Sequence, residues 1–311
     1  MSDRSTDRDG ALAALFPGQN SQVLGMARDL YENSGAAKQA LDQAEAALPG
    51  LLGIMWDGPE ERLQLTANQQ PALVAAGAAA FAAWREAGGE EPAFAAGHSL
   101  GEFTALVAAG SLPLGDAVQL VRKRGEYMQE AVPEGVGAMA AILKLDPDLI
   151  DTICRETDGV VEIANLNAPG QTVISGEKAA VMAAGERLQE ARARVVPLKV
   201  SAPFHCSLMA PAARKLAGDL RRVSFAETSF GVVGNVTSEL HRDAGEIAAL
   251  LERQVTSPVR WVESLRTLHQ LGVRRFVEFG SGKVLTGLVQ RTLADVSAVA
   301  VIDSASLKEA L

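Results

Sequence analysis

Residues 92–103 read PAFAAGHSLGEF, which predicts a strand, a tight turn and a helix in direct succession. An apolar run covers residues 93–96, and a helical pattern follows from residue 102 to residue 109. Between them, glycines stand two places before and two places after Ser99, the G-x-S-x-G spacing of a nucleophile elbow. Glycine lets the backbone crowd without Cβ clashes, so the serine projects at a helix N-terminus, where N–H groups favour negative charge. The N–H of Leu100 is then the natural oxyanion donor.

The elbow pattern also occurs by chance, and its alternative is a glycine-flanked turn whose serine only caps a helix. A catalytic serine at neutral pH needs a base. His98 is adjacent to Ser99 and should point away from it, and we interpret His269 as structural on an amphipathic helix. The polar stretch ELHRDAGE predicts a solvated surface position for His241. His205, in SAPFHCSLM, is therefore the favoured base, but no convincing acid precedes it, so a backbone carbonyl is one candidate to orient its imidazole.

Strands alternate with helices around the elbow, which predicts an α/β fold with a parallel, hydrolase-like sheet covered on both faces. Pro71 suits the first turn of a helix that Gly88 and Gly89 end. The expected strands of this sheet are residues 12–16, 93–96, 231–236, 274–282 and 297–303. Helices are expected from near residue 25 and over residues 36–48.

The middle of the chain has its own pattern of strand, helix, strand, strand, helix, strand, which is the ferredoxin-like arrangement. Asp146 should cap its first helix and Gly159 should end it. The expected elements are residues 137–143, 146–159, 160–167, 171–176, 177–191 and 194–200. We therefore predict a disordered tail at 1–10, a large catalytic domain at 11–132 and 201–311, and an inserted ferredoxin-like subdomain at 133–200.

Composition excludes several classes of protein. The 311 residues are 48% hydrophobic and 22% charged, as in a globular enzyme, and the formal charge of −9 argues against a nucleic-acid binder. Cys154 and Cys206 match no metal spacing or disulfide framework, which favours a reducing cytosol and no metal. The polar start MSDRSTDRDG is not expected to be a signal peptide. The apolar stretch 72–84 is shorter than the roughly 20 residues of a membrane span, so no membrane association is expected.

Seven motifs in order together resemble the malonyl-CoA:acyl-carrier-protein transacylases of fatty acid synthesis. The acyltransferase domains of polyketide synthases are more distant relatives of that family. The resemblance covers about residues 15–302. Its motifs are FPGQNSQ (16–22), GHSLGE (97–102), RGEYMQEAVPEGVGAM (124–139), NAPGQTVISG (167–176), SAPFHCSLM (201–209), QVTSPVRW (254–261) and EFGSGKVLTGL (278–288).

The resemblance implies a role for each matching residue. Ser99 would carry the acyl group, His205 would be its base, and the backbone carbonyl of Gln254 would orient His205. The N–H groups of Gln19 and Leu100 would form the oxyanion hole. The substrate pocket would hold Arg124, which would bind the malonyl carboxylate, together with Met128 and Asn167.

Four positions leave alternatives open. Without the family, the run VRKRGEYM is a solvated basic face, and only inside an acyl pocket would Arg124 bind a carboxylate through two parallel hydrogen bonds. Asn20 stands where the family commonly has glycine, and asparagine tolerates left-handed backbone geometry. Ser281 replaces a common proline, which should loosen its loop. Cys206 is expected to be a small buried filler rather than a second nucleophile.

The implied reaction is a ping-pong transfer of malonyl from malonyl-CoA to the phosphopantetheine thiol of an acyl carrier protein, with no tightly bound cofactor. The chain would be a cytoplasmic monomer. A serine hydrolase that clears acyl thioesters and a non-catalytic carrier-binding module are the alternatives. The sequence fits an enzyme that supplies malonyl units to either fatty acid or polyketide synthesis. In the family, a leucine at the position of Leu100 goes with malonyl rather than methylmalonyl as the acyl group. Candidate carrier contacts are Arg192, Arg194, Lys199, Arg274, Arg275 and Lys283.

Overall fold

The strand β1 (Ala11–Phe16) shows how the large sheet is built, because its alternate residues enter different cores. Leu12 and Phe16 pack into one group of buried side chains, whereas Ala13 and Leu15 pack into another. Alternate side chains of a strand point to opposite faces, so this strand is buried on both sides, as parallel strands are. The computed structural model in which this is seen describes residues 10–133, 135–200, 202–241 and 243–311.

The large sheet has the strand order β7-β2-β1-β8-β9, and every neighbouring pair is parallel. Helix α5 (Thr66–Glu86) packs against β8 on the face where Leu12 and Phe16 are buried. Helix α12 (Trp261–Gln270) packs against β8 on the face where Ala13 and Leu15 are buried, so helices cover both faces of the sheet. The prediction of a parallel α/β sheet is confirmed. The other strands are β2 (Phe94–Gly97), β7 (Gly231–Val233), β8 (Val273–Phe279) and β9 (Ser297–Val301).

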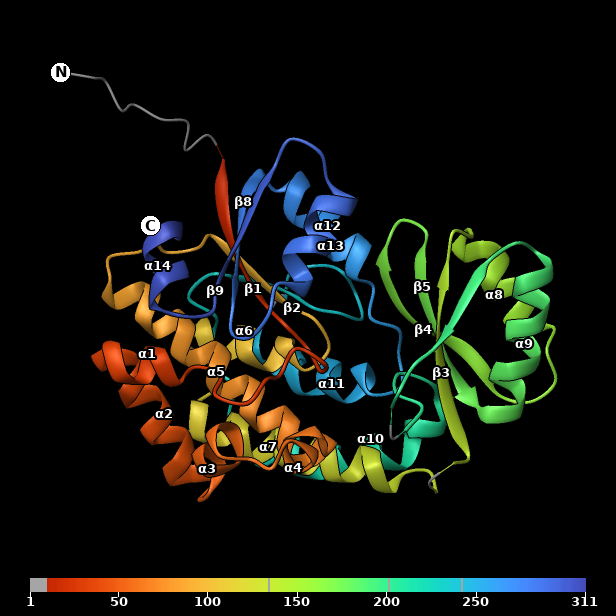
Figure 1. Cartoon of the computed structure of the whole chain (residues 1–311), viewed down its shortest axis with the longest axis horizontal. Helices are drawn as coiled ribbons and strands as arrows, with labels where there is room; N and C mark the ends of the chain where they lie inside the picture. The colour runs from red at the N-terminus through yellow and green to blue at the C-terminus, as the bar shows by residue number, and fades with distance from the viewer. Residues whose placement is uncertain (1–9, 134, 201, 242) are drawn as a thin grey trace.

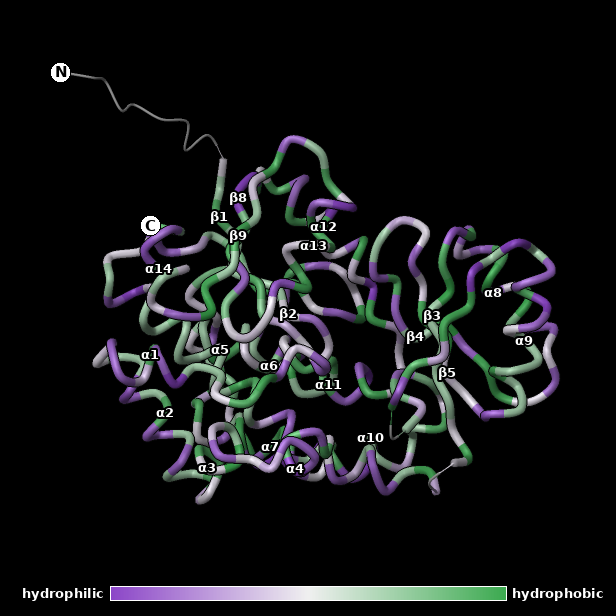
Figure 2. Tube along the Cα trace, viewed as in Figure 1, coloured by the Kyte–Doolittle hydropathy of each residue, from purple (hydrophilic) through white to green (hydrophobic). Residues whose placement is uncertain are grey.

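The helices of this lobe surround the sheet (Figure 1). Figure 2 shows hydrophobic residues along the central strands and hydrophilic residues recurring on outer helices such as α2. Their bounds are α1 (Arg28–Asn33), α2 (Gly35–Ala47), α3 (Leu51–Trp56), α4 (Glu60–Gln64), α5 (Thr66–Glu86), α6 (Gly101–Ala108), α7 (Leu114–Glu130), η1 (Ser207–Met209), α10 (Ala210–Leu220), α11 (Ala244–Gln254), α12 (Trp261–Gln270), α13 (Val284–Thr292) and α14 (Ser304–Ala310). In the part of the chain that the structure describes, no helix is long and apolar enough to cross a membrane.

The start of α5 differs from the prediction. The helix begins at Thr66, so Pro71 lies inside it rather than in its first turn. The extra turn reads TANQQ, whose polarity suggests a loop, yet Gln69 is 3% exposed and Gln70 is fully buried. These amides are buried because they face the site described below, where they find polar partners.

The second sheet forms a separate lobe, on the right of Figure 1, with α8 and α9 packed on it. Its order β4-β5-β3-β6 is antiparallel throughout, and the two outer positions are taken by the second and fourth strands of the lobe. This is the ferredoxin-like order that the sequence predicts. Asp146 caps α8 as expected, accepting from the N–H of Asp148 at 2.9 Å. The elements are β3 (Gly137–Leu143), α8 (Pro147–Arg155), β4 (Val161–Ala168), β5 (Gln171–Glu177), α9 (Lys178–Glu190) and β6 (Arg194–Pro197).

Main-chain hydrogen bonds join the two lobes. The N–H of Leu166 on β4 donates to the carbonyl of Val259 at 2.9 Å, and the N–H of Val259 donates to the carbonyl of Ala164 at 2.9 Å. The inserted subdomain at 133–200 stays a proposal. Residues 134 and 201, next to its two ends, lie outside the described residues. The expected tail at 1–10 also lies outside them, apart from Gly10.

Candidate active site

The turn between β2 and α6 is the predicted elbow. Ser99 has a φ of 51°, in the left-handed region that most residues avoid. A Cβ on Gly97 would lie 1.8 Å from the carbonyl carbon of Gly101, and a Cβ on Gly101 would lie 2.0 Å from the carbonyl oxygen of Phe16. Both glycines are therefore required for strand, turn and helix to pack this closely.

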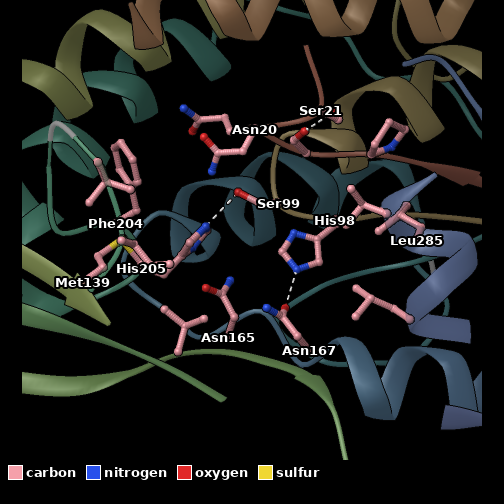
Figure 3. Close-up of a pocket in the computed structure, with 18 of the residues that line it drawn as sticks. Asn20, Ser21, His98, Ser99, Met139, Asn165, Asn167, Phe204, His205 and Leu285 are labelled. Carbon is pink, nitrogen blue, oxygen red and sulfur yellow. Dashed lines mark hydrogen bonds between the residues drawn. The ribbon is translucent and has the colours of Figure 1, made fainter. Parts of the chain in front are cut away.

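Ser99 meets His205 across this turn (Figure 3). The Ser99 Oγ lies 2.7 Å from His205 Nε2, and His205 Nδ1 lies 2.9 Å from the backbone carbonyl oxygen of Gln254. A carbonyl only accepts, so Nδ1 carries the proton and Nε2 is free to accept the serine proton. Burial, reinforced by the positive charge of Arg124, lowers the pKa of His205 to about 3, so the imidazole of the resting site is neutral and its Nε2 carries a free lone pair.

Arg124 is the second side chain, besides His205, that contacts the Ser99 hydroxyl. Its Nη2 donates to Ser99 Oγ and to Gln254 Oε1, both at 3.1 Å, and its Nη1 donates to Gln70 Oε1 at 2.8 Å. The residue is fully buried, so the alternative of a solvated basic face is excluded for it. Burial lowers the Arg124 pKa to about 10, opposed by the charge of Glu102, and the guanidinium stays charged at neutral pH.

The loop after β1, residues 17–22 and called the oxyanion loop below, carries Gln19, whose N–H the sequence predicts to be the second oxyanion donor. A Cβ on Gly18 would lie 2.6 Å from the carbonyl oxygen of His98, so the loop rests directly on the turn. Among the residues that the structure describes, no hydrogen bond uses the N–H of Gln19 or of Leu100. Both N–H groups are therefore available to a developing oxyanion.

The two departures from the family pattern both lie in or against this loop. Asn20 has a φ of 73°, the left-handed geometry for which a glycine is usual. The Ser281 hydroxyl, buried at 4% exposure, donates to the carbonyl of Ser21 at 2.6 Å. The Ser21 hydroxyl in turn donates to the carbonyl of Gly18 at 2.8 Å. Ser281 thus ties its own loop to the oxyanion loop, a contact that a proline could not make.

Ser99, His205 and Gln19 open into a cavity of about 700 Å³ between the lobes. Asn167 also lines it, and its Oδ1 lies 2.8 Å from His98 Nε2, so that this ring nitrogen is paired with Asn167 and not with Ser99. Met128 is buried at 1% exposure, with its sulfur 3.8 Å from Gln70 Nε2. Within the described ranges, no group of three or more His, Cys, Asp or Glu side chains could hold a metal ion.

Comparison with known proteins places this geometry in a family. A model of the acyl transferase domain matches residues 14–308. This chain belongs to the acyl transferase domain family. It is 45% identical to a malonyl CoA-acyl carrier protein transacylase of Salmonella typhimurium over 303 residues, covering 96% of this chain and 98% of that protein. A relative of the same name from Bacillus subtilis is 44% identical, over 96% of each chain.

Solved structures of similar proteins have the same fold as this chain. An acyl carrier protein S-malonyltransferase of Vibrio cholerae superposes with a TM-score of 0.94 at 44% identity, covering 97% of this chain and all of that one. A malonyl-transacylase in complex with its type II polyketide synthase acyl-carrier protein superposes with a TM-score of 0.94 at 46% identity, covering 97% and 99%.

Sequence reasoning missed part of the site of this acyl transferase domain. Asn235 binds the elbow, Gln70 binds Arg124, and Glu102 binds Gln254. Local signals existed: Asn235 stands just after a buried strand, and Glu102 is a lone charge in the apolar run GEFTALVA. The surface prediction for His241 is wrong, because its side chain is 2% exposed and its Nε2 lies 3.1 Å from Glu102 Oε1.

Proposed function

We propose that this acyl transferase moves a malonyl group from malonyl-CoA to the phosphopantetheine thiol of an acyl carrier protein, through a malonyl ester on Ser99. The observation that carries the proposal is the position of Ser99 Oγ, 2.7 Å from a neutral imidazole and 3.1 Å from a buried guanidinium. The imidazole supplies a base and the guanidinium a binding partner for an anionic acyl group. The relatives that carry the malonyl transacylase name support the same reaction.

In the first half-reaction, His205 Nε2 takes the Ser99 proton as Oγ attacks the thioester carbonyl carbon. The oxyanion accepts from the N–H groups of Leu100 and Gln19, and the Gln254 carbonyl stabilises the imidazolium through Nδ1–H. When the C–S bond breaks, His205 gives its proton to the coenzyme A thiolate. In the second half-reaction His205 takes the proton of the carrier thiol, the thiolate attacks the ester, and the proton returns to Ser99.

Arg124 selects the acyl group in this scheme. The carboxylate of a malonyl ester is two bonds beyond the carbonyl carbon that Ser99 holds, which places it beside the guanidinium. Arg124 Nε is buried with no hydrogen-bond partner among the described residues, so a carboxylate can accept from Nε and Nη2 together. An acetyl ester would leave that donor unpaired, at the cost of its desolvation.

Several finer expectations belong to the same proposal. Ser99, His205 and the backbone supply the chemistry, so the proposed enzyme needs no tightly bound cofactor. The expected protein is a cytoplasmic monomer with a carrier protein as its macromolecular partner. The competing hydrolase would use the same pair of side chains, but a general acyl hydrolase gains nothing from the buried Arg124.

Mass spectrometry of the intact protein tests the proposal. Exposure to malonyl-CoA should add one malonyl group, and addition of a phosphopantetheinylated carrier protein should remove it and malonylate the carrier. The Ser99→Ala variant should gain no adduct. Rapid loss of the adduct to water without an acceptor would favour the hydrolase, and failure of the native protein to acquire any adduct would favour a non-catalytic module.

A further inference from the structure

Glu102, in the first turn of α6, is a buried carboxylate that the reaction scheme leaves without a task. It is 1% exposed. Its Oε2 accepts from Gln254 Nε2 at 2.7 Å and from the backbone N–H of Asn235 at 3.1 Å. One oxygen therefore holds two residues that come from distant parts of the chain.

Those two residues hold the nucleophile from both sides. The N–H of Ser99 donates to Asn235 Oδ1 at 2.6 Å, and the carbonyl of Ser99 accepts from Gln254 Nε2 at 2.9 Å. Asn235 Nδ2 also donates to the carbonyl of Gly97 at 2.7 Å. Ser99 has the left-handed backbone that persists only when its surroundings enforce it. The two side-chain contacts to the Ser99 backbone come from residues that the Glu102 carboxylate holds, and the Glu102 N–H adds a third contact by donating to the Ser99 carbonyl at 3.1 Å.

The same carboxylate helps to set which way the Gln254 amide points. Because Nε2 faces two acceptors, Glu102 Oε2 and the Ser99 carbonyl, Oε1 is turned toward Arg124 and accepts from its Nη2 at 3.1 Å. With the amide reversed, its NH2 group would face the donors of Arg124, and the guanidinium would be displaced. The position of Arg124 thus depends on an acceptor that it does not touch.

We propose that Glu102 is a positioning residue that holds Ser99 in its reactive conformation and, through Gln254, holds Arg124 for an acyl carboxylate. Its second oxygen is 3.1 Å from His241 Nε2, whose ring fills the space beside Gly234 and limits rotation of the carboxylate. The part that concerns Arg124 rests on the proposed malonyl transfer, and the part that concerns Ser99 does not.

Two variants separate the reach of Glu102 from its charge. Glu102→Gln keeps the length, and its amide oxygen can still accept from Gln254 and Asn235 while its NH2 faces His241. Glu102→Asp keeps the charge but withdraws the oxygens by one methylene. We expect the kcat of Glu102→Gln to stay within about fivefold of the native value. For Glu102→Asp we expect kcat to fall about 100-fold and the preference for malonyl over acetyl to fall about tenfold.

The rate of Ser99 labelling by a fluorophosphonate gives a readout that does not depend on the natural acyl group. Glu102→Asp should be labelled far more slowly than Glu102→Gln, with both variants folded by their unfolding midpoints. Glu130→Gln, which changes an exposed carboxylate paired with Lys215 on the outside of the molecule, is the matched control. Equal labelling of the two Glu102 variants, or the reverse order, would overturn the proposal. Absence of malonyl transfer in the native protein would remove the proposed function and leave this labelling test intact.

Discussion

At the scale of single residues, the buried Arg124 side chain is the feature that bears on which acyl group the site accepts. It is fully buried, carries a charge, and has one N–H group that finds no partner among the described residues. Leaving a charged donor unpaired costs free energy, which a carboxylate ligand recovers and a neutral acyl group does not. Under the proposed function, specificity for an anionic acyl group is therefore already present in the resting site.

Replacing Arg124 by alanine tests that specificity. We expect malonyl transfer to fall by about 100-fold or more in kcat/KM, equivalent to about 3 kcal/mol, because the carboxylate is then buried without a partner. Acetyl transfer should stay the same or rise, since no guanidinium is left unpaired. Rates with malonyl-CoA and acetyl-CoA measured side by side check this, and Lys215→Ala, an exposed cation on α10, serves as the control. An unchanged malonyl preference would remove Arg124 from the acyl site.

At the scale of elements, the site depends on how closely loops approach the end of β2. The oxyanion loop lies on the elbow at Gly18, and the loop before α13 is fastened to it by the Ser281 hydroxyl. A hydrogen bond of this kind, buried and between two loops, limits where the Gln19 N–H can point.

The variant Ser281→Ala should leave the Ser21 carbonyl without its donor. We expect the free energy of unfolding to fall by about 1 kcal/mol and kcat to fall several-fold with little change in KM, because the oxyanion donor loses its support. Ser264→Ala is the control, since Ser264 is also buried, at 1% exposure, and its hydroxyl donates over 3.0 Å to the Arg260 carbonyl at the start of α12. Urea unfolding and steady-state kinetics on both variants make the comparison; equal effects on kcat would show that the Ser281 contact only stabilises the fold.

The elements themselves were largely predictable from local patterns. The elbow requires glycines at fixed spacing, and the ferredoxin-like lobe alternates strand and helix over a short stretch, so both are visible in the sequence. The first turn of α5 was missed because buried amides look like a polar loop until their partners are known. His241 was misplaced for the same reason, since its partner Glu102 is far away in sequence.

The support of the nucleophile could not be predicted in this way. It joins α6, the end of β7 and the end of α11, and only the folded sheet brings these together. The family resemblance supplied the role of the Gln254 carbonyl, which no local pattern indicates. Glu102 ends the motif GHSLGE, but the resemblance supplied no role for it or for Asn235.

At the scale of the whole molecule, burying a neutral histidine makes stability depend on pH. The pKa of His205 is 6.5 in an ordinary environment and about 3 here, lowered first by burial and then by Arg124. Below pH 6.5 the unfolded chain binds a proton that the native chain does not, so protonation favours unfolding.

The free energy of unfolding should therefore fall by about 1.4 kcal/mol for each pH unit below 6.5 through this group alone, until the native His205 also protonates. Urea unfolding of the native protein and of His205→Gln between pH 7 and pH 5 isolates the contribution, because the other titratable groups, such as the buried His98, act on both. The native protein should lose about 2 kcal/mol more than the variant over that range. Parallel curves would show that His205 titrates normally in the folded state.

The pairing of β4 with the segment around Val259 has a consequence for how substrate preference can change. The two hydrogen bonds there join peptide groups, so side-chain substitutions along this segment leave these donors and acceptors in place. Evolution or engineering toward bulkier acyl units is therefore expected to replace residues that line the cavity with smaller ones, and not to move the two lobes apart.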